Sequence, residues 1–208
     1  MFFALTKISN QGFVRDFSVT EISPVMTMTE KGMKHSTPTA TESSLYDETF
    51  PAVQHAWISF VMSSSSMGYW ELGYKATTQN KTVAHTGSVI EVSANATGQE
   101  WIKSFKYQDV NYYLSLVNPN DFQTGINTIQ AYVSQQNAEK AKPWPLADQE
   151  FTIEIIPTMP DMGNHSSPNN ESLTLQEDGS YQGKLNLTMT GVWDIHLNVK
   201  DATGNTTT

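Results

Sequence analysis

Methionine and histidine residues gather in two short stretches of the sequence. Residues 21–38 read EISPVMTMTEKGMKHSTP, and residues 154–168 read EIIPTMPDMGNHSSP. Thioether sulfur and imidazole nitrogen are ligands that suit Cu(I), and imidazole also serves Cu(II) and Zn(II). These stretches therefore suggest a metal site, and copper is the metal we expect. The candidate metal ligands are Met26, Met28, Met33, His35, Met159, Met162 and His165.

A purely structural role is the alternative for the same residues. Methionine fills irregular gaps in apolar cores, and a His-Ser pair can also form hydrogen bonds in a turn. Met62 and Met189 each continue an alternating apolar run, so we expect them in the core rather than in a metal site. We expect Trp70 and Trp193 to be core residues too, each burying a large ring between sheets.

The two stretches belong to a longer internal repeat. Residues 55–62 align with residues 182–189, and Gly68-Tyr69-Trp70 aligns with Gly191-Val192-Trp193. A shared order of this kind predicts two copies of one domain, residues 1–96 and 97–208. The first copy has no counterpart of the strand expected at residues 107–117. We therefore expect that the chain begins inside the natural protein, after an export signal has been removed.

The elements that must position these residues are strands. Apolar and polar residues alternate with period two, which is typical of half-buried strands, while helical periodicity is scarce. Asn and Gly clusters separate the runs, as in Asn118-Pro119-Asn120-Asp121. Many short strands at this spacing predict an all-β fold with two tandem immunoglobulin-like β-sandwich domains. Strands are expected within residues 57–62, 110–116, 126–133, 185–189 and 193–199.

Composition excludes several classes of function. The 208-residue chain has no cysteine, so disulfides, zinc-thiolate sites and a cysteine nucleophile are excluded. Its net charge of −9 argues against nucleic acid as a partner, which needs a basic surface. No apolar run reaches the roughly 18–20 residues of a transmembrane segment. The sequence has no Gly-x-Ser-x-Gly elbow, phosphate loop or compact carboxylate pair, so we expect no enzyme, and a hydrolase least of all.

The second copy resembles the YtkA-like and FixH-like domains of bacterial envelope proteins. The residues that carry the resemblance are FQTGINTIQAYV, PTMPDMGNHSSP and GSYQGKLNLTMTGVWDIHLNV. Residues 3–75 match the same pattern more loosely, with Met26-Thr27-Met28 in place of Met-Pro-x-Met. The chain is thus identified as two tandem copies of such a domain.

This resemblance implies an immunoglobulin-like sandwich, export, and in many members a link to copper handling. We therefore expect a periplasmic or cell-surface protein whose signal and lipoprotein-type anchor lie outside this chain. The first hypothesis for its function is a non-enzymatic binding or accessory protein that holds copper through the Met/His loops. The second is a structural or interaction module that binds another envelope protein and no metal.

Overall fold

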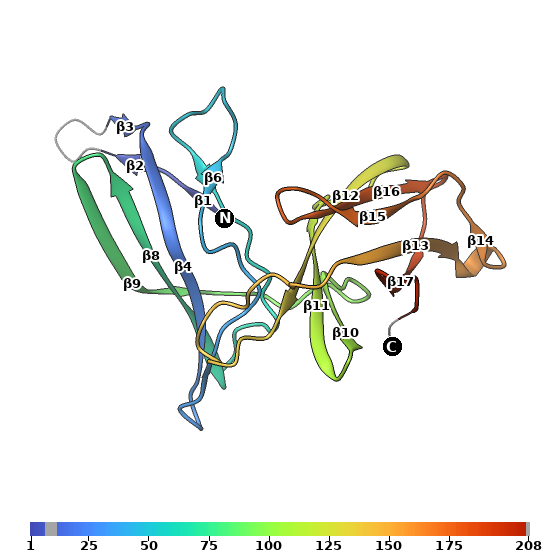
Figure 1. The fold of residues 1–208 in the computed structure, drawn as a ribbon, viewed down its shortest axis with the longest axis horizontal. Helices are drawn as coiled ribbons and strands as arrows, with labels where there is room; N and C mark the ends of the chain where they lie inside the picture. The colour runs from blue at the N-terminus through green and yellow to red at the C-terminus, as the bar shows by residue number, and fades with distance from the viewer. Residues whose placement is uncertain (7–11, 207–208) are drawn as a thin grey trace. The chain divides into compact units, whose positions relative to one another are not determined.

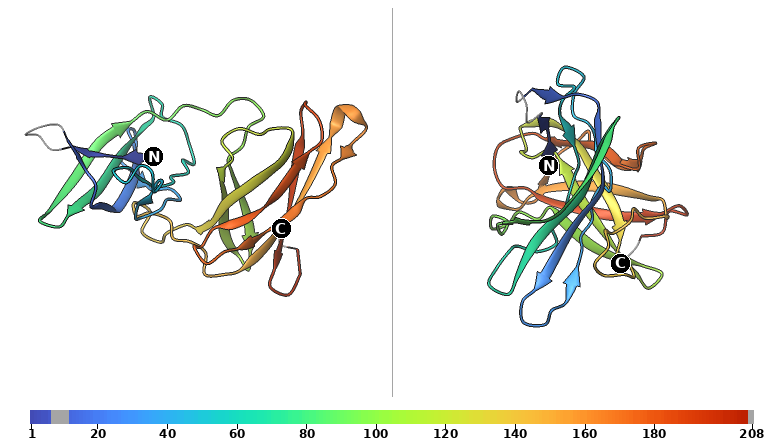
Figure 2. Two further views of the ribbon diagram at one scale, coloured as in Figure 1. Left: turned by 90° about the horizontal axis from the view of Figure 1, so that it is seen from above. Right: turned by 90° about the vertical axis from the view of Figure 1, so that its left-hand side faces the viewer.

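The computed structural model describes residues 1–6 and 12–206, and it confirms the all-β fold. The chain forms two compact units (Figures 1 and 2). Unit 1 consists of Met1–Gln99 together with Gln136–Pro145, and unit 2 consists of Glu100–Gln135 and Leu146–Thr208. We expected one boundary after residue 96. The chain instead leaves unit 1 after Gln99, and residues 136–145 group with unit 1 again.

Unit 1 is built around one long antiparallel sheet, in the order β5-β4-β8-β9. Its short strands pair in two further small sheets, β1-β7-β6 and β2-β3. The strands are β1 (Phe2–Phe3), β2 (Leu5–Thr6), β3 (Phe13–Val14), β4 (Phe17–Met28), β5 (Lys34–His35), β6 (Ser44–Leu45), β7 (Gln54–His55), β8 (Gly68–Thr78) and β9 (Lys81–Ile90).

Unit 2 is an all-β sandwich made from one folded sheet, in the order β10-β11-β12-β16-β15-β13-β14, with β17 on the far side of β13. The strand β15 pairs with β16 and also with β13, so it links the two layers. The elements are β10 (Ile102–Tyr107), β11 (Val110–Asn118), β12 (Gly125–Gln135), β13 (Phe151–Met159), the 3-10 turn η1 (Pro160–Met162), β14 (His165–Ser166), β15 (Glu171–Leu175), β16 (Tyr181–Leu187) and β17 (Asp194–Asp201).

The core of unit 2 follows from the alternation of apolar residues along its strands. Ile129, Ala131 and Val133 of β12 are buried, whereas Ile126 points outward and is 64% exposed. Asn127 is buried among them, and its side-chain amide bonds the backbone of Gln123, which keeps this polar group satisfied. Thirteen buried residues form this core, whereas the core cluster of unit 1 has only five.

The strand expected at residues 57–62 is not formed. Only Ile58 makes an isolated bridge, to Thr39. Beyond it the Ser59 N–H still donates to the Pro38 carbonyl at 2.9 Å, but the next backbone groups bond a side chain: the Thr37 hydroxyl donates to the Ser59 carbonyl and accepts from the Val61 N–H. A hydroxyl that satisfies the backbone in this way competes with a ladder of strand hydrogen bonds. Alternation alone cannot show this competition.

No helix among residues 1–6 and 12–206 has the length and apolarity needed to cross a membrane.

Candidate functional site

The β4–β5 hairpin of unit 1 brings the candidate ligands of the first stretch onto one face. Met26 lies directly opposite His35. The same register places Met28 opposite Met33, and the Met28 N–H donates to the Met33 carbonyl at 2.9 Å. Directly opposite residues of an antiparallel pair share a face, with Cβ atoms roughly 4.5–5.5 Å apart. Three thioethers and one imidazole therefore form a compact set, called here the hairpin face.

His35 is oriented by its own backbone neighbour. Its Nδ1 lies 3.1 Å from the Ser36 carbonyl oxygen, which can only accept, so Nδ1 carries the proton. The lone pair of the neutral ring is then on Nε2. The ring also packs edge-on against Trp70, at 5.5 Å between centroids. A hydrogen bond that fixes the tautomer and the ring plane is the usual support of a ligating histidine.

Exposure rises along the hairpin face toward the turn. Met26 is 1% exposed, Met28 and His35 are half-buried, and Met33 is 52% exposed. The sulfurs of Met26 and Met28 both lie near Gly68, 2.9 and 3.2 Å from where a Cβ on that glycine would be. The absent side chain leaves room in which the two sulfurs come together. The hairpin face thus has a buried thioether at one end and an accessible one at the other.

Unit 2 assembles only part of the second candidate set. Met159, at the end of β13, lies opposite His165 in β14, as Met26 lies opposite His35. Met162 sits at the end of η1 and is 58% exposed, and His165 is exposed as well. The turn between the paired residues is tight, and it ends at Gly163, which has a φ of +66°. Met162 therefore has no residue opposite it across the β13–β14 pair. The candidate donors of unit 2 are thus more dispersed than those of the hairpin face.

The same supporting contacts surround the Met–His pair in both units. Ser36 Oγ donates to the Pro24 carbonyl at 2.5 Å, and Ser166 Oγ donates to the Pro157 carbonyl at 2.9 Å. Each serine thereby ties the short strand to the long strand beside it. The serine of each His-Ser pair thus takes the hydrogen-bonding role that the sequence left open, and in unit 1 His35 forms a hydrogen bond as well.

The hydrogen bonds of the tryptophan indole N–H groups also correspond between the two units. Trp70 Nε1 donates to the Met62 carbonyl at 3.0 Å, and Trp193 Nε1 donates to the Met189 carbonyl at 3.1 Å. The prediction that both methionines lie in the core is wrong, because Met62 is 43% exposed and Met189 is 36% exposed. Each methionine accepts the indole hydrogen bond with its backbone carbonyl oxygen, which any residue at that position would provide. His165 lies near Trp193, at 6.4 Å between ring centroids.

The two tryptophans differ in burial. Trp70 is fully buried, as predicted, and Phe60 packs against it with ring centroids 5.0 Å apart. Trp193 is only half-buried at the margin of the unit 2 core. Each tryptophan stands two residues after a glycine that accommodates a methionine: Gly68 receives Met26, and Gly191 lies against the Met159 methyl group.

Residues 136–145 cover residues 36–37, the irregular segment that follows the hairpin face. The Ser36 N–H donates to the Lys140 carbonyl at 2.6 Å, and the Trp144 N–H donates to the Thr37 carbonyl at 3.3 Å. Ser36 and Thr37 are both fully buried. The segment forms an irregular strap with one turn, closed by Lys142 N–H to Glu139 O.

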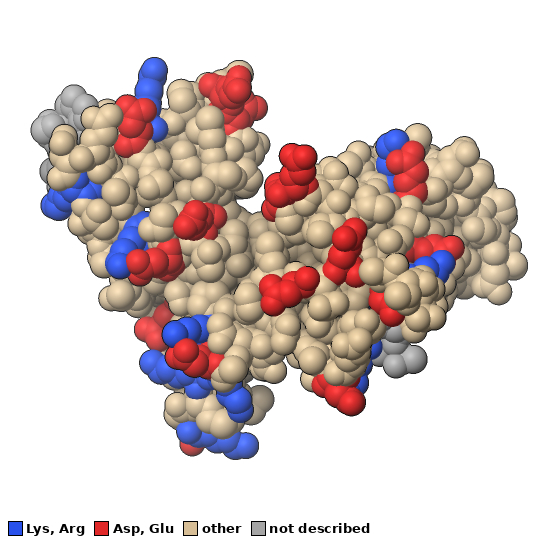
Figure 3. Space-filling model, viewed as in Figure 1, with Lys and Arg blue, Asp and Glu red and all other residues tan. Residues whose placement is uncertain are grey.

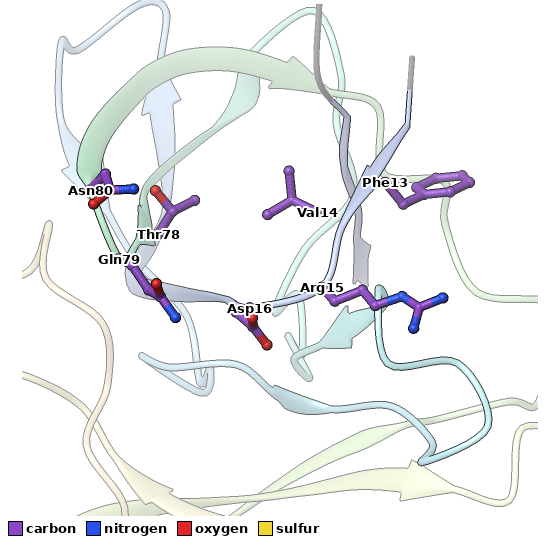
Figure 4. A pocket seen from close by; sticks show the side chains of 7 residues that line it. All are labelled: Phe13, Val14, Arg15, Asp16, Thr78, Gln79 and Asn80. Carbon is purple, nitrogen blue, oxygen red and sulfur yellow. The ribbon is translucent and has the colours of Figure 1, made fainter. Parts of the chain in front are cut away.

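A hollow lies elsewhere in unit 1, between the start of β4 and the β8–β9 turn. Figure 4 shows Thr78, Gln79 and Asn80 on one side of it and residues 13–16 on the other. It is roughly 30 Å from the hairpin face, given about 3.3 Å per residue along β4.

Within the described residues, no group of three or more His, Asp or Glu side chains could hold a metal ion.

The sequence singled out the candidate donors but not the residues that pack against them. Gly68 and Trp70 lie against the hairpin face, and neither was singled out as part of a site. One signal was present, since Gly-x-Trp follows the Met/His stretch in both halves of the chain.

Comparison with known proteins identifies one domain. The YtkA-like family model matches residues 106–198, which confirms the resemblance seen in the second half of the sequence. No curated protein and no solved structure matches the chain.

Proposed function

With residues 106–198 as a YtkA-like domain, we propose that the chain is an exported, non-enzymatic accessory protein that binds Cu(I) on the hairpin face of unit 1. The observation that carries this proposal is the pairing of Met26 with His35 and of Met28 with Met33 on one face of the β4–β5 hairpin. Chance would rarely place three thioethers and an imidazole in direct opposition.

The donor chemistry fits a soft monovalent ion. Cu(I) prefers thioether and imidazole to oxygen ligands, and the hairpin face offers no carboxylate. Met28, Met33 and the Nε2 atom of His35 would hold the ion, and the buried Met26 would complete the set if its side chain turned outward. A bound Cu(I) ion would be held for storage or transfer. This chain's contribution is to present the donors and to fix the His35 ring through Ser36.

Unit 2 supports a weaker site of the same kind. Met159 is 5% exposed and its methyl group lies against Gly191, so the side chain is engaged in packing. His165 and Met162 are accessible, and two accessible donors hold Cu(I) less tightly than a fuller set. We therefore propose that unit 1 carries the principal site.

We also propose that unit 1 contains a second, divergent copy of the YtkA-like or FixH-like domain. The support is the set of equivalent contacts: Met opposite His, Ser to the Pro carbonyl, and Trp Nε1 to the Met carbonyl. Export to the periplasm or cell surface is part of the proposal and rests on the family resemblance. Fractionation of cells that express the full-length gene tests it.

A metal-free structural or interaction module remains the second candidate function. The near-complete burial of Met26 and Met159, each against a glycine, favours it. Under this alternative the methionines only fill the end of the sheet, as methionine does in many cores, and the protein binds another envelope protein.

Anaerobic titration of Cu(I) against a competing chelator separates the two functions. Met28→Leu with Met33→Leu keeps the apolar volume but removes two thioethers, and His35→Asn removes the imidazole. We expect either change to weaken Cu(I) binding about tenfold or more, the scale on which metal sites respond to loss of supporting groups. Trp70 fluorescence reports binding independently, because its ring contacts His35.

Met67→Leu is the matched control, because Met67 is also exposed in unit 1 but lies outside the hairpin face. It should leave the affinity unchanged. Wild-type protein that binds Cu(I) no more tightly than the Met28→Leu, Met33→Leu variant would exclude the hairpin face and favour the metal-free module.

A further inference from the structure

Three lysines lie around the hairpin face of unit 1 without a partner of opposite charge. Lys31 lies in the turn between β4 and β5, Lys34 lies in β5, and Lys140 lies in the strap of residues 136–145. All three are exposed, and among the residues that the structure describes none of them forms an ion pair. Six other lysines of the chain do form ion pairs. The positive charge next to the hairpin face is therefore available to a partner.

This end of unit 1 is a basic patch on an acidic chain. Residues 26–35 and 136–145 together carry four lysines and two glutamates, a net charge of +2, so the rest of the chain carries −11 of the total of −9. Figure 3 shows Lys and Arg side chains gathered where the β4–β5 turn and the strap lie in Figure 1. A local charge opposite in sign to that of the whole molecule orients an approaching acidic partner, because it attracts the partner to this end alone.

The corresponding segment of unit 2 has no such patch. Residues 159–168 contain one carboxylate, Asp161, and no lysine or arginine. Positive charge therefore accompanies only the hairpin face, which offers the fuller set of donors. This difference links the lysines to the proposed principal site rather than to the hairpin shape that the two units share.

The placement of the lysines fits a broad partner surface rather than one small anion. Lys34 directly precedes His35 in β5, so by alternation it points away from the hairpin face. Lys140 lies beside Ser36, whose N–H donates to its carbonyl at 2.6 Å. Lys31 lies in the turn, so the three positive groups occupy the turn, the outer side of the edge strand and the strap. Groups placed in this way do not converge on a single ion, but one partner that covers the end of the hairpin can contact them all.

We propose that this end of unit 1 docks an acidic segment of another protein, which gives or takes Cu(I) at Met33. The inference rests on the proposed function and names the class of partner for that site. Met33 is the most exposed donor of the hairpin face, at 52%. In the transfer its sulfur donates a lone pair to Cu(I) while one ligand of the partner leaves the ion, so the oxidation state does not change. Lys31, Lys34 and Lys140 hold the partner's carboxylates around that point.

The charge distribution favours a protein over an anionic membrane. Membrane-binding segments rely on clusters of about four to eight Lys or Arg residues. Here Glu30 and Glu139 stand among the lysines and reduce the net charge of the patch to +2, while the rest of the chain, at −11, would be repelled by anionic lipid. A patch of mixed sign suits a protein surface, because complementary charges of both signs fix the register of two proteins.

A metal-free peptide tests the docking separately from copper binding. The probe is a labelled Met-Thr-Met peptide flanked by four glutamates, and its neutral counterpart has four glutamines instead. Added to the full chain, the acidic peptide should bind saturably and lose affinity as salt is raised, and the neutral peptide should bind about tenfold or more weakly. The joint change Lys31→Gln, Lys34→Gln, Lys140→Gln should weaken the acidic peptide to the same extent. It should also slow Cu(I) transfer from the loaded acidic peptide about tenfold or more.

A triple change elsewhere is the matched control. Lys75→Gln, Lys81→Gln and Lys184→Gln remove the same charge from solvent-accessible lysines outside the patch and should leave peptide binding unchanged. Glutamate in place of the three patch lysines should instead make the chain bind a Lys-flanked peptide. A variant that fails to fold would not show this gain.

Four outcomes would each overturn the proposal: equal binding of the acidic and neutral peptides, an equal loss of binding in the patch and control variants, tighter binding to phosphatidylglycerol vesicles than to the acidic peptide, and displacement of the peptide by phosphate at constant ionic strength. The last two would identify a lipid or a small anion as the occupant. Cu(I) binding without peptide binding would refute the docking surface alone. Peptide binding without Cu(I) binding would support the docking surface and refute the copper function.

Discussion

Replacing Gly183 with alanine tests the close approach of β15 to its paired neighbour β16. A Cβ at this position would lie 2.6 Å from the Glu171 carbonyl oxygen and 2.8 Å from the Ser172 carbonyl oxygen. Both are backbone atoms, so no side-chain rotation relieves the overlap. Strand β15 would have to move away by several tenths of an ångström, at the point where its pairing register with β16 already shifts.

The expected cost combines two opposing effects. Overpacking in a well-packed region costs about 1–3 kcal/mol, while alanine in a strand gains roughly 0.5–1 kcal/mol over glycine from the smaller loss of backbone entropy. The net destabilisation of Gly183→Ala should therefore lie between about 0 and 2.5 kcal/mol, and toward the upper end because the atoms that a Cβ would meet belong to the backbone. For a domain of the size of unit 2 this lowers the melting temperature by roughly 4–8 °C per kcal/mol.

Gly73→Ala in β8 is the matched control. Its Cβ would meet nothing closer than the His85 carbonyl oxygen at 3.6 Å, which is ordinary contact. Urea unfolding measures the stability of both variants. Hydrogen exchange at the β16 amides additionally shows whether Gly183→Ala loosens that strand. If Gly183→Ala is as stable as the wild type, or if Gly73→Ala is destabilised equally, then β15 does not link the two layers in the way described.

Three further changes have definite expected outcomes. Asn127→Ala should destabilise unit 2 by about 1–3 kcal/mol in denaturant unfolding, because it leaves buried backbone groups of the Gln123 turn unpaired; a neutral result would contradict that role. Burial raises the pKa of Tyr181, so its stabilising contribution is complete below the unfolded-state pKa of about 10 and is lost as pH rises through the higher folded-state pKa. Tyr181→Phe should therefore flatten the alkaline loss of stability in pH-dependent thermal melts, and an unchanged alkaline limb would contradict it. Met26→Ala should cost about 2–5 kcal/mol by calorimetry, whereas the exposed Met33→Ala should cost almost nothing, and equal costs would show that the burial is misassigned.

How much the sequence could predict differs between the strands and the candidate site. Regular alternation at residues 126–133 gave the buried face of β12 correctly, because period two fixes which side chains share a face. The run at residues 57–62 alternates just as well but is irregular, because the hydroxyl of the distant Thr37 bonds its backbone. Long-range competition of this sort leaves no local trace in the sequence.

The sequence identified the candidate ligands by residue type, but it could not predict how they are arranged. The spacing of Met26, Met28, Met33 and His35 could not show that a hairpin would pair them across one face, because the register depends on the length of the turn. The donors are spaced differently in the two stretches, with Met26-Thr27-Met28 in one and Met159-Pro160-Asp161-Met162 in the other. The structure shows a direct consequence of that spacing: Met28 has an opposite partner, while Met162, in the shorter turn of η1, has none.

The return of residues 136–145 to unit 1 affects how the chain can fold during synthesis. The Ser36 N–H needs the Lys140 carbonyl, which is made only after most of β10, β11 and β12 have emerged. The ribosome adds about 5–20 residues per second, so roughly 45 residues separate Gln99 from Pro145 by about 2–9 seconds. During that interval unit 1 still lacks its strap. The two units therefore cannot fold one after the other in chain order, because the last segment of unit 1 is made after the first strands of unit 2.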